Sequence, residues 1–187
     1  TRYDTFDWYL ALGPLSNVNA KYFYGKIPTW NDFVAHPDYD SFWKLQTMVP
    51  HLREVRVATL NVAGWWDQED FYGPLAIYEA LEKQDPHNLN FLVVGPWNHG
   101  GWGGGPGDRL GAIAFDGATG KYFRDEIQAP FFAYFLKDRG RLDLPEALTF
   151  EAGSNRWRRW PAWPPVQNAQ ARSLYFGPGA TLSFDPP

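Results

Sequence analysis

The sequence predicts a mixed α/β fold. Two short apolar runs, at residues 57–62 and 90–94, are rich in β-branched side chains and have the composition of buried strands. Residues 74–84 between them carry apolar side chains at helical spacing and begin with a proline, which a first helical turn tolerates. A strand, a crossover helix and a second strand normally form two parallel neighbours with a right-handed connection.

The flanking segments divide the chain into three parts. Residues 1–50 carry short helix and cap signals without a strand pattern, which indicates a helical segment. Residues 51–145 hold the strand–helix–strand unit and a second predicted helix at 127–137. Residues 146–187 show short alternating runs between Pro- and Gly-rich turns, which predicts the start of an antiparallel β-sandwich. Because so few strands cannot close a sandwich, we expect the chain to be a fragment of a larger protein.

Composition narrows the possible functions. A formal net charge of −4 and the absence of a basic run argue against nucleic acid as the main partner. No apolar segment approaches the ~18–20 residues of a membrane span. The absence of cysteine excludes disulfides, thiolate metal sites and a cysteine nucleophile within this chain. Ten tryptophans indicate aromatic cores, and they also suit a pocket for a ring-bearing ligand or a carbohydrate.

An acid and a histidine follow the two predicted strands. Asp67 comes after the first strand and His99 after the second. Parallel neighbours end at the same edge of a sheet, so we expect the two side chains within hydrogen-bonding reach, as part of a hydrolase site. Glu69 and Asp70 add two carboxylates close by. They indicate either a binding site for a positive group or caps for the next helix, and spacing alone does not separate these readings.

Other candidate sites have weaker support. His36, His51 and His87 are interpreted as structural or solvated, because none has a carboxylate-bearing strand end nearby. No HExxH or clustered histidine spacing occurs, so no metal site is expected. The glycine-rich residues 100–108 lack the Lys-Ser/Thr of a phosphate cradle and are predicted to form a mobile loop beside the site. No G-x-S-x-G occurs, so a nucleophilic serine and its oxyanion donors are expected before Thr1.

Two motifs carry a family resemblance. GWWDQEDFYG and GPWNHGGW resemble the α-amino acid ester hydrolase and glutaryl-7-aminocephalosporanic acid acylase group, within the wider cocaine esterase and X-prolyl dipeptidyl-peptidase family of serine hydrolases. The resemblance implies an α/β-hydrolase domain with a helical cap, followed by a jelly-roll domain. On this basis residues 1–50 would be a cap segment, residues 51–145 the C-terminal part of the α/β-hydrolase domain, and residues 146–187 the start of the jelly roll. Supporting stretches, which extend the resemblance over most of the chain, are LGPLSNVNAKYFYG, WNDFVAHPDYDSFW, FRDEIQAPFFAYFLK and GSNRWRRWPAWPP.

The resemblance also implies roles for the site residues. Asp67 would be the acid of a Ser–His–Asp triad and His99 the general base. Glu69 and Asp70 match two positions of a carboxylate cluster that binds the substrate ammonium group, with a third carboxylate upstream. The implied reaction is hydrolysis of esters or amides of α-amino acids or β-lactam side chains through an acyl-enzyme. The resemblance further implies a small-molecule substrate, no cofactor, no nucleic-acid or membrane partner, a homo-oligomeric parent enzyme in the periplasm or outside the cell, and an inactive isolated chain.

Two other readings stay open. The chain could come from an X-prolyl dipeptidyl-peptidase-like or cocaine esterase-like hydrolase without amino-group recognition. A non-catalytic carbohydrate-binding fragment would explain the tryptophans and the β segment. It would not explain why an acid and a histidine follow successive strands.

Overall fold

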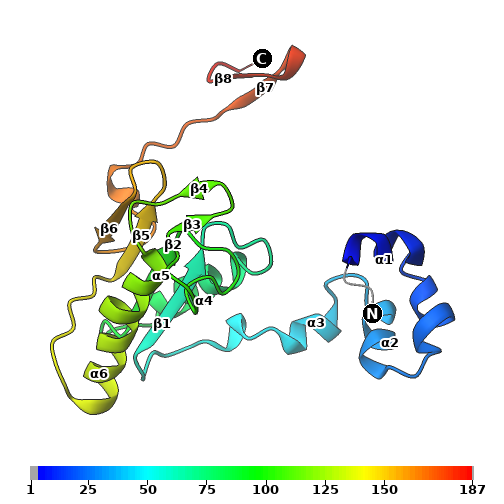
Figure 1. Cartoon of the computed structure of the whole chain (residues 1–187), viewed down its shortest axis with the longest axis horizontal. Helices are drawn as coiled ribbons and strands as arrows, with labels where there is room; N and C mark the ends of the chain where they lie inside the picture. Colours follow the sequence, from blue (N-terminus) through cyan, green and yellow to red (C-terminus); the bar gives the residue numbers. More distant parts are fainter. Residues whose placement is uncertain (1–3, 187) are drawn as a thin grey trace. The chain divides into compact units, whose positions relative to one another are not determined.

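The computed structural model describes residues 4–186, which divide after Met48 into two compact units (Figure 1). The described part of the first unit is built of helices. Asp4 and Asp40 accept backbone N–H groups at the starts of two of them, and Pro28 begins a third. Whether this unit acts as a cap stays a prediction. Its helices are α1 (Thr5–Leu12), the π-helix η1 (Asn19–Phe23), α2 (Pro28–Ala35) and α3 (Ser41–Gln46).

A four-stranded sheet organises the second unit. The strand order is β1-β2-β5-β6; β1, β2 and β5 run parallel, and β6 runs antiparallel to β5. Helix α4 connects β1 to β2, so the predicted strand–helix–strand unit is confirmed. The two strands are paired in register up to Gly64 and Gly95, so their carboxyl ends lie at one edge. The bounds are β1 Thr59–Gly64, α4 Tyr72–Glu82, β2 Asn90–Gly95, β5 Ala147–Glu151 and β6 Arg156–Trp160, and the short 3₁₀-helix η2 (Val49–His51) precedes the sheet.

The interpretation of the segment after residue 146 was wrong in part. Residues 147–160 do not open a separate antiparallel β domain, because β5 pairs in parallel with β2 and extends the α/β sheet. Ala147 through Phe150 are all buried, as in a strand covered on both faces. Farther along, β7 (Tyr175–Gly177) and β8 (Thr181–Ser183) form an antiparallel pair of their own, preceded by η4 (Val166–Asn168) and separated by η5 (Pro178–Ala180). The jelly roll stays a prediction.

A long helical segment lies between β2 and β5. The predicted helix at 127–137 is longer than expected and begins at Thr119. Its middle is π-helical and ends at Gln128, two residues before Pro130, which lacks the N–H that a regular turn would use. The segments are α5 (Thr119–Tyr122), the π-helix η3 (Phe123–Gln128) and α6 (Ala129–Lys137), after the two-residue strands β3 (Arg109–Leu110) and β4 (Ile113–Ala114).

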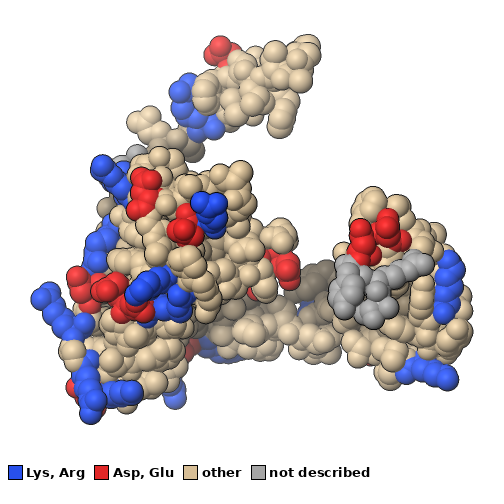
Figure 2. Space-filling model, in the orientation of Figure 1, with Lys and Arg blue, Asp and Glu red and all other residues tan. Residues whose placement is uncertain are grey.

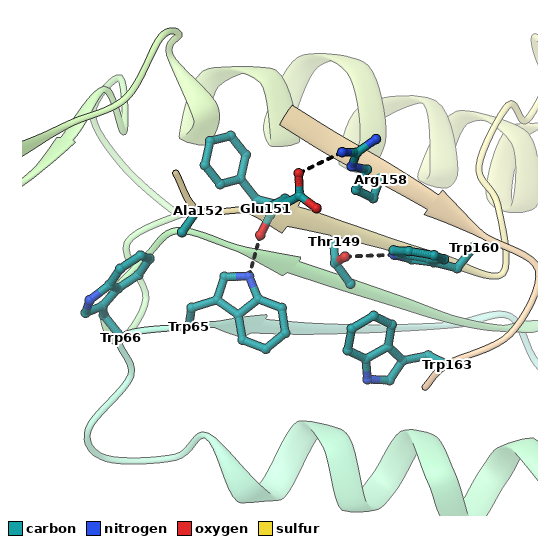
Figure 3. Close-up of a pocket in the computed structure, with 9 residues that line it drawn as sticks. Trp65, Trp66, Thr149, Glu151, Ala152, Arg158, Trp160 and Trp163 are labelled. Atoms are coloured by element: carbon teal, nitrogen blue, oxygen red, sulfur yellow. Dashed lines mark hydrogen bonds and ion pairs between the residues drawn. The ribbon is translucent and has the colours of Figure 1, made fainter. Parts of the chain in front are cut away.

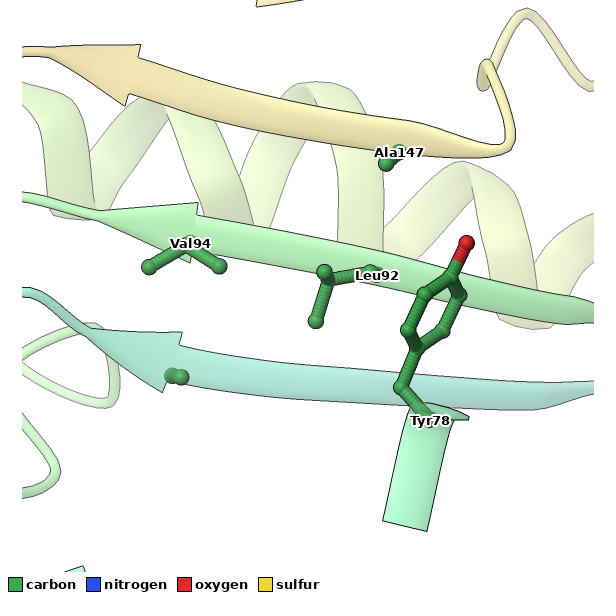
Figure 4. Packing of buried hydrophobic residues seen from close by; sticks show 5 residues of the cluster. Tyr78, Leu92, Val94 and Ala147 are labelled. Carbon is green, nitrogen blue, oxygen red and sulfur yellow. The ribbon is translucent and has the colours of Figure 1, made fainter. Parts of the chain in front are cut away.

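Both faces of the sheet are covered by apolar side chains. Leu92 and Val94 of β2 belong to one buried cluster with Tyr78 of α4, in which Tyr78 lies beside Leu92 (Figure 4), and the alternate residue Val93 clusters on the opposite face with Phe123 of η3. Because the sheet is packed on both faces, it is a rigid support for the loops that follow β1 and β2.

The surface of the second unit is mixed in charge. On the face shown in Figure 2, acidic and basic side chains lie beside one another. Ion pairs join Arg158 to Glu151 at 2.8 Å and Arg159 to Asp143 at 2.7 Å. Over residues 4–186, no helix is long and apolar enough to cross a membrane. Within that same range, no group of three or more histidines and carboxylates could hold a metal ion.

Candidate active site

The loops after β1 and β2 bring Asp67 and His99 together. His99 Nδ1 lies 3.0 Å from Asp67 Oδ2 and 3.3 Å from Oδ1, so the predicted hydrogen-bonding reach is confirmed. The acid is shielded, with its side chain 3% exposed, whereas the His99 side chain is 51% exposed. The shielded carboxylate of Asp67 thus orients the imidazole of His99, and Nε2 is on the side of the ring that faces the solvent.

Backbone N–H groups hold the Asp67 carboxylate in place. Its Oδ1 accepts from the N–H of Glu69 at 2.8 Å and of Asp70 at 2.9 Å. The Asp70 N–H is the largest cause that lowers the pKa of Asp67, and the Glu69 N–H and His99 lower it further against the effect of burial. The carboxylate is therefore ionised near neutral pH, and its Oδ2 is left to face His99.

The environment of His99 suits a general base. Its hydrogen bond to Asp67 is the largest cause that raises its pKa, followed by the charges of Asp67 and Glu69. An Nδ1 that faces a carboxylate donates its proton to it. In the neutral imidazole Nε2 is then an acceptor, free to take a proton from a hydroxyl group.

The ends of the two strands are in close contact at Trp97. The N–H of Trp66 donates to Trp97 O at 3.0 Å, and the N–H of Trp65 donates to Gly95 O at 2.9 Å. A Cβ on Gly64 would lie 2.2 Å from Trp97 O, and a Cβ on Gly95 would lie 2.4 Å from the Trp97 ring. Sequence reasoning missed these contacts, although a glycine at the end of each apolar run was the available signal.

The neighbouring carboxylates divide between the two roles that the sequence left open. Asp70 Oδ1 accepts from the N–H of Gly73 at 3.1 Å and so caps the first turn of α4. Glu69 is 64% exposed, and its Oε2 lies 4.0 Å from His99 Nε2. Negative charge therefore faces the nitrogen that would handle the reacting proton.

The remaining predicted features lie around this pair. His36 bonds Asp40 at 2.6 Å and stacks on Phe42, which fits a structural histidine, and His51 and His87 are exposed. The glycine-rich loop after His99 is bonded to η3 through Arg124, which donates to two of the loop's carbonyl groups.

An aromatic pocket adjoins the acid loop (Figure 3). It encloses about 440 Å³, and its walls include Trp65 and Trp66, the two residues before Asp67. Trp65 Nε1 donates to Phe150 O at 2.7 Å, and Trp160 Nε1 donates to Thr149 Oγ1 at 2.9 Å. The indoles of Trp65 and Trp160 are thus fixed by hydrogen bonds in the wall of this pocket.

Known proteins resemble this chain in sequence and in fold. Residues 9–101, which include both loops, match the family described as X-Pro dipeptidyl-peptidase (S15 family). Candidate serine esterases of Mycobacterium bovis and Mycobacterium tuberculosis are each 32% identical over 133 residues, which is 70% of this chain and 19% of theirs. The chain thus spans about a fifth of the length of these curated relatives.

Two solved structures match the whole chain. An aminopeptidase from a marine sediment Thaumarchaeota archaeon is 39% identical with a TM-score of 0.90, and this chain covers 31% of it. An α-amino acid ester hydrolase is 32% identical with a TM-score of 0.89, and this chain covers 32% of it. In each case the match includes 100% of this chain and about a third of the other.

Proposed function

Because residues 9–101 of this chain match the X-Pro dipeptidyl-peptidase (S15) family of hydrolases, we propose that Asp67 and His99 are the acid and the base of a serine hydrolase. The mixed α/β fold and the resemblance to α-amino acid ester hydrolases, both expected from the sequence, are confirmed by the comparisons. The observation that carries the proposal is the 3.0 Å contact between a shielded carboxylate and a solvent-reaching imidazole.

The proposed reaction uses a serine on a segment outside these 187 residues. His99 Nε2 accepts the serine proton as the serine oxygen attacks the carbonyl carbon of an ester or amide. His99 then returns the proton to the leaving alcohol or amine, which leaves an acyl-enzyme. Water attacks the acyl-enzyme by the same proton path and restores the serine. Asp67 holds the imidazole in the required tautomer and stabilises its cation.

For the substrate, we propose an acyl group with a free α-amino group, including the amino-acyl side chains of β-lactams. An ammonium group is attracted to carboxylates, and Glu69 places one at 4.0 Å from His99 Nε2. Asp70 contributes a second negative charge from the start of α4, where it is also the helix cap. The names of the two solved relatives, an aminopeptidase and an α-amino acid ester hydrolase, refer to such substrates.

A simple esterase is the second candidate. The curated relatives are candidate serine esterases, and the helix-capping bond of Asp70 is the observation that favours a purely structural role for that carboxylate. The two candidates share Asp67 and His99 and differ only in whether the substrate needs an amino group.

The test uses a longer protein that contains this chain. His99→Ala should lower kcat for an activated ester by several orders of magnitude, whereas His87→Ala, which alters an exposed histidine, should not. A serine-reactive phosphonate should label the wild-type protein and label His99→Ala much more slowly, as followed by mass spectrometry. Near-normal activity of His99→Ala would remove His99 from the mechanism.

A further inference from the structure

The loop that carries His99 is anchored by a buried hydroxyl group on α5. The indole of Trp97 donates its Nε1–H to Thr119 Oγ1 at 2.9 Å, and both residues are buried, at 2% and 3% exposure. Thr119 in turn donates its hydroxyl proton to Gly107 O at 2.5 Å. One hydroxyl group therefore bonds a residue just before His99 and another at the far end of the loop.

Other contacts bring the same loop against the same helix. The N–H groups of Gly120 and Lys121 both donate to Pro106 O, at 3.0 and 3.2 Å. Gly107 has φ +68°, and a Cβ there would lie 2.4 Å from Gly120 N, so only glycine allows this approach. The ring of Phe123 packs against the Trp97 indole, with 5.5 Å between the ring centroids. The helix thus fixes the loop along its length.

Trp97 connects this anchor to both site loops. Its carbonyl accepts the N–H of Trp66, the residue before Asp67, and its own chain reaches His99 two residues later. Without the Thr119 hydroxyl, the buried indole N–H would have no acceptor, which is costly enough to make the ring move. Movement of Trp97 would shift both Asp67 and His99.

We infer that Thr119 is a positioning residue for the Asp67–His99 pair and acts through the Trp97 indole. Its catalytic consequence rests on the proposed function, whereas its effect on the geometry of the pair does not. The inference separates two roles of a buried hydrogen bond. A bond that only stabilises the fold affects unfolding, whereas a positioning bond also affects the imidazole of His99.

The test is the pKa of His99 measured by NMR in this chain. Thr119→Val keeps the side-chain shape without the hydroxyl, and it should lower the His99 pKa toward its ordinary value, because the bond to Asp67 weakens. Thr119→Ser keeps the hydroxyl and should preserve the wild-type pKa. In a longer protein with hydrolase activity, Thr119→Val should lower kcat about tenfold or more with little change in KM.

A matched control is available on α4. Tyr78 is fully buried and donates its hydroxyl proton to Glu146 Oε1 at 2.9 Å, so Tyr78→Phe keeps the ring and removes a hydrogen bond away from the His99 loop. It should destabilise the chain to a similar extent and leave the His99 pKa unchanged. Trp97→Phe removes the donor instead of the acceptor, and it provides the same test of the His99 pKa if Thr119→Val does not fold.

The outcomes separate the two proposals. An unchanged His99 pKa in Thr119→Val, or in Trp97→Phe where Thr119→Val does not fold, would overturn the positioning role even if the longer protein is an active hydrolase. A lowered pKa in Thr119→Val and its recovery in Thr119→Ser would support the positioning role even if the longer protein shows no hydrolysis. Absence of hydrolysis in the longer protein, together with this pKa pattern, would reject the proposed function and leave the positioning role intact.

Discussion

Gly64→Ala probes the close contact between the two strand ends. The added Cβ would lie 2.2 Å from Trp97 O, whereas a carbon–oxygen contact normally needs about 3.3 Å. One of the two backbones must therefore move by roughly 1 Å, since neither atom belongs to a flexible side chain. Overpacking of this kind costs about 1–3 kcal/mol of folding free energy. Because Trp97 O also accepts the Trp66 N–H, the movement should separate the loops that carry Asp67 and His99.

Two assays measure the consequence. Urea denaturation of Gly64→Ala should show a free energy of unfolding lower than that of the wild type by about 1–3 kcal/mol. In a longer, active protein kcat should fall about a hundredfold, as expected for a displacement of roughly 1 Å between reacting groups. Gly104→Ala is the control, because its Cβ would meet nothing within 4 Å and its backbone is not left-handed. Its free energy of unfolding should stay within about 0.5 kcal/mol of the wild type.

The reasoning would be refuted if Gly64→Ala matched Gly104→Ala in both assays. A loss of stability with an unchanged kcat would also contradict part of it. That result would show that the strand ends can move apart without disturbing the acid and the base.

Two further predictions concern carboxyl groups. Glu69→Gln removes the charge at 4.0 Å from His99 Nε2, so kcat/KM for an α-amino ester should fall about tenfold while that for the matching ester without the amino group changes little. Equal losses for the two esters would defeat ammonium recognition, and Glu79→Gln on the exposed side of α4 serves as the control. Burial, together with the neighbouring Glu82, raises the pKa of Glu146 to about 7 from an ordinary value of 4.5. The folded state thus binds an extra proton, and this stabilisation is fully present below the ordinary pKa and lost as the pH rises through about 7. The free energy of unfolding should therefore decline less steeply between pH 4.5 and about 7 in Glu146→Gln than in the wild type. Urea denaturation at a series of pH values measures this decline. An equally steep decline in the variant would show that Glu146 is not its cause.

The parts of the fold that the sequence predicted depend on local rules. The strand composition of β1 and β2, the helical spacing of α4 and the handedness of the crossover are sufficient to place Asp67 and His99 at one edge. The pairing of β5 with β2 is non-local, because a long connection separates the two strands in the sequence. Its short apolar run, Ala147 to Phe150, gives no indication of whether one face or both will be covered.

The helix before β5 shows a second limit. Its first turns begin at Thr119 and contain glycine and charged residues, so the apolar periodicity becomes clear only from about residue 127. Thr119 also escaped notice as a site-related residue, because its role depends on Trp97 lying across the helix. A lone threonine has no sequence signature for accepting an indole N–H. A hydrogen bond of this kind can be identified only when the positions of the helix and the loop relative to each other are known.

The carboxylates show why the capping and chemical interpretations did not have to exclude one another. An ionised carboxyl group has two oxygens and about four acceptor positions. Asp67 uses Oδ1 for the backbone turn and Oδ2 for His99, so the turn is what aims the second oxygen. An asparagine could satisfy the turn with its one oxygen, but its NH₂ group would then face His99 Nδ1 and favour the tautomer with the proton on Nε2. Aspartate is therefore the side chain that can both hold this turn and leave Nε2 free to accept a proton.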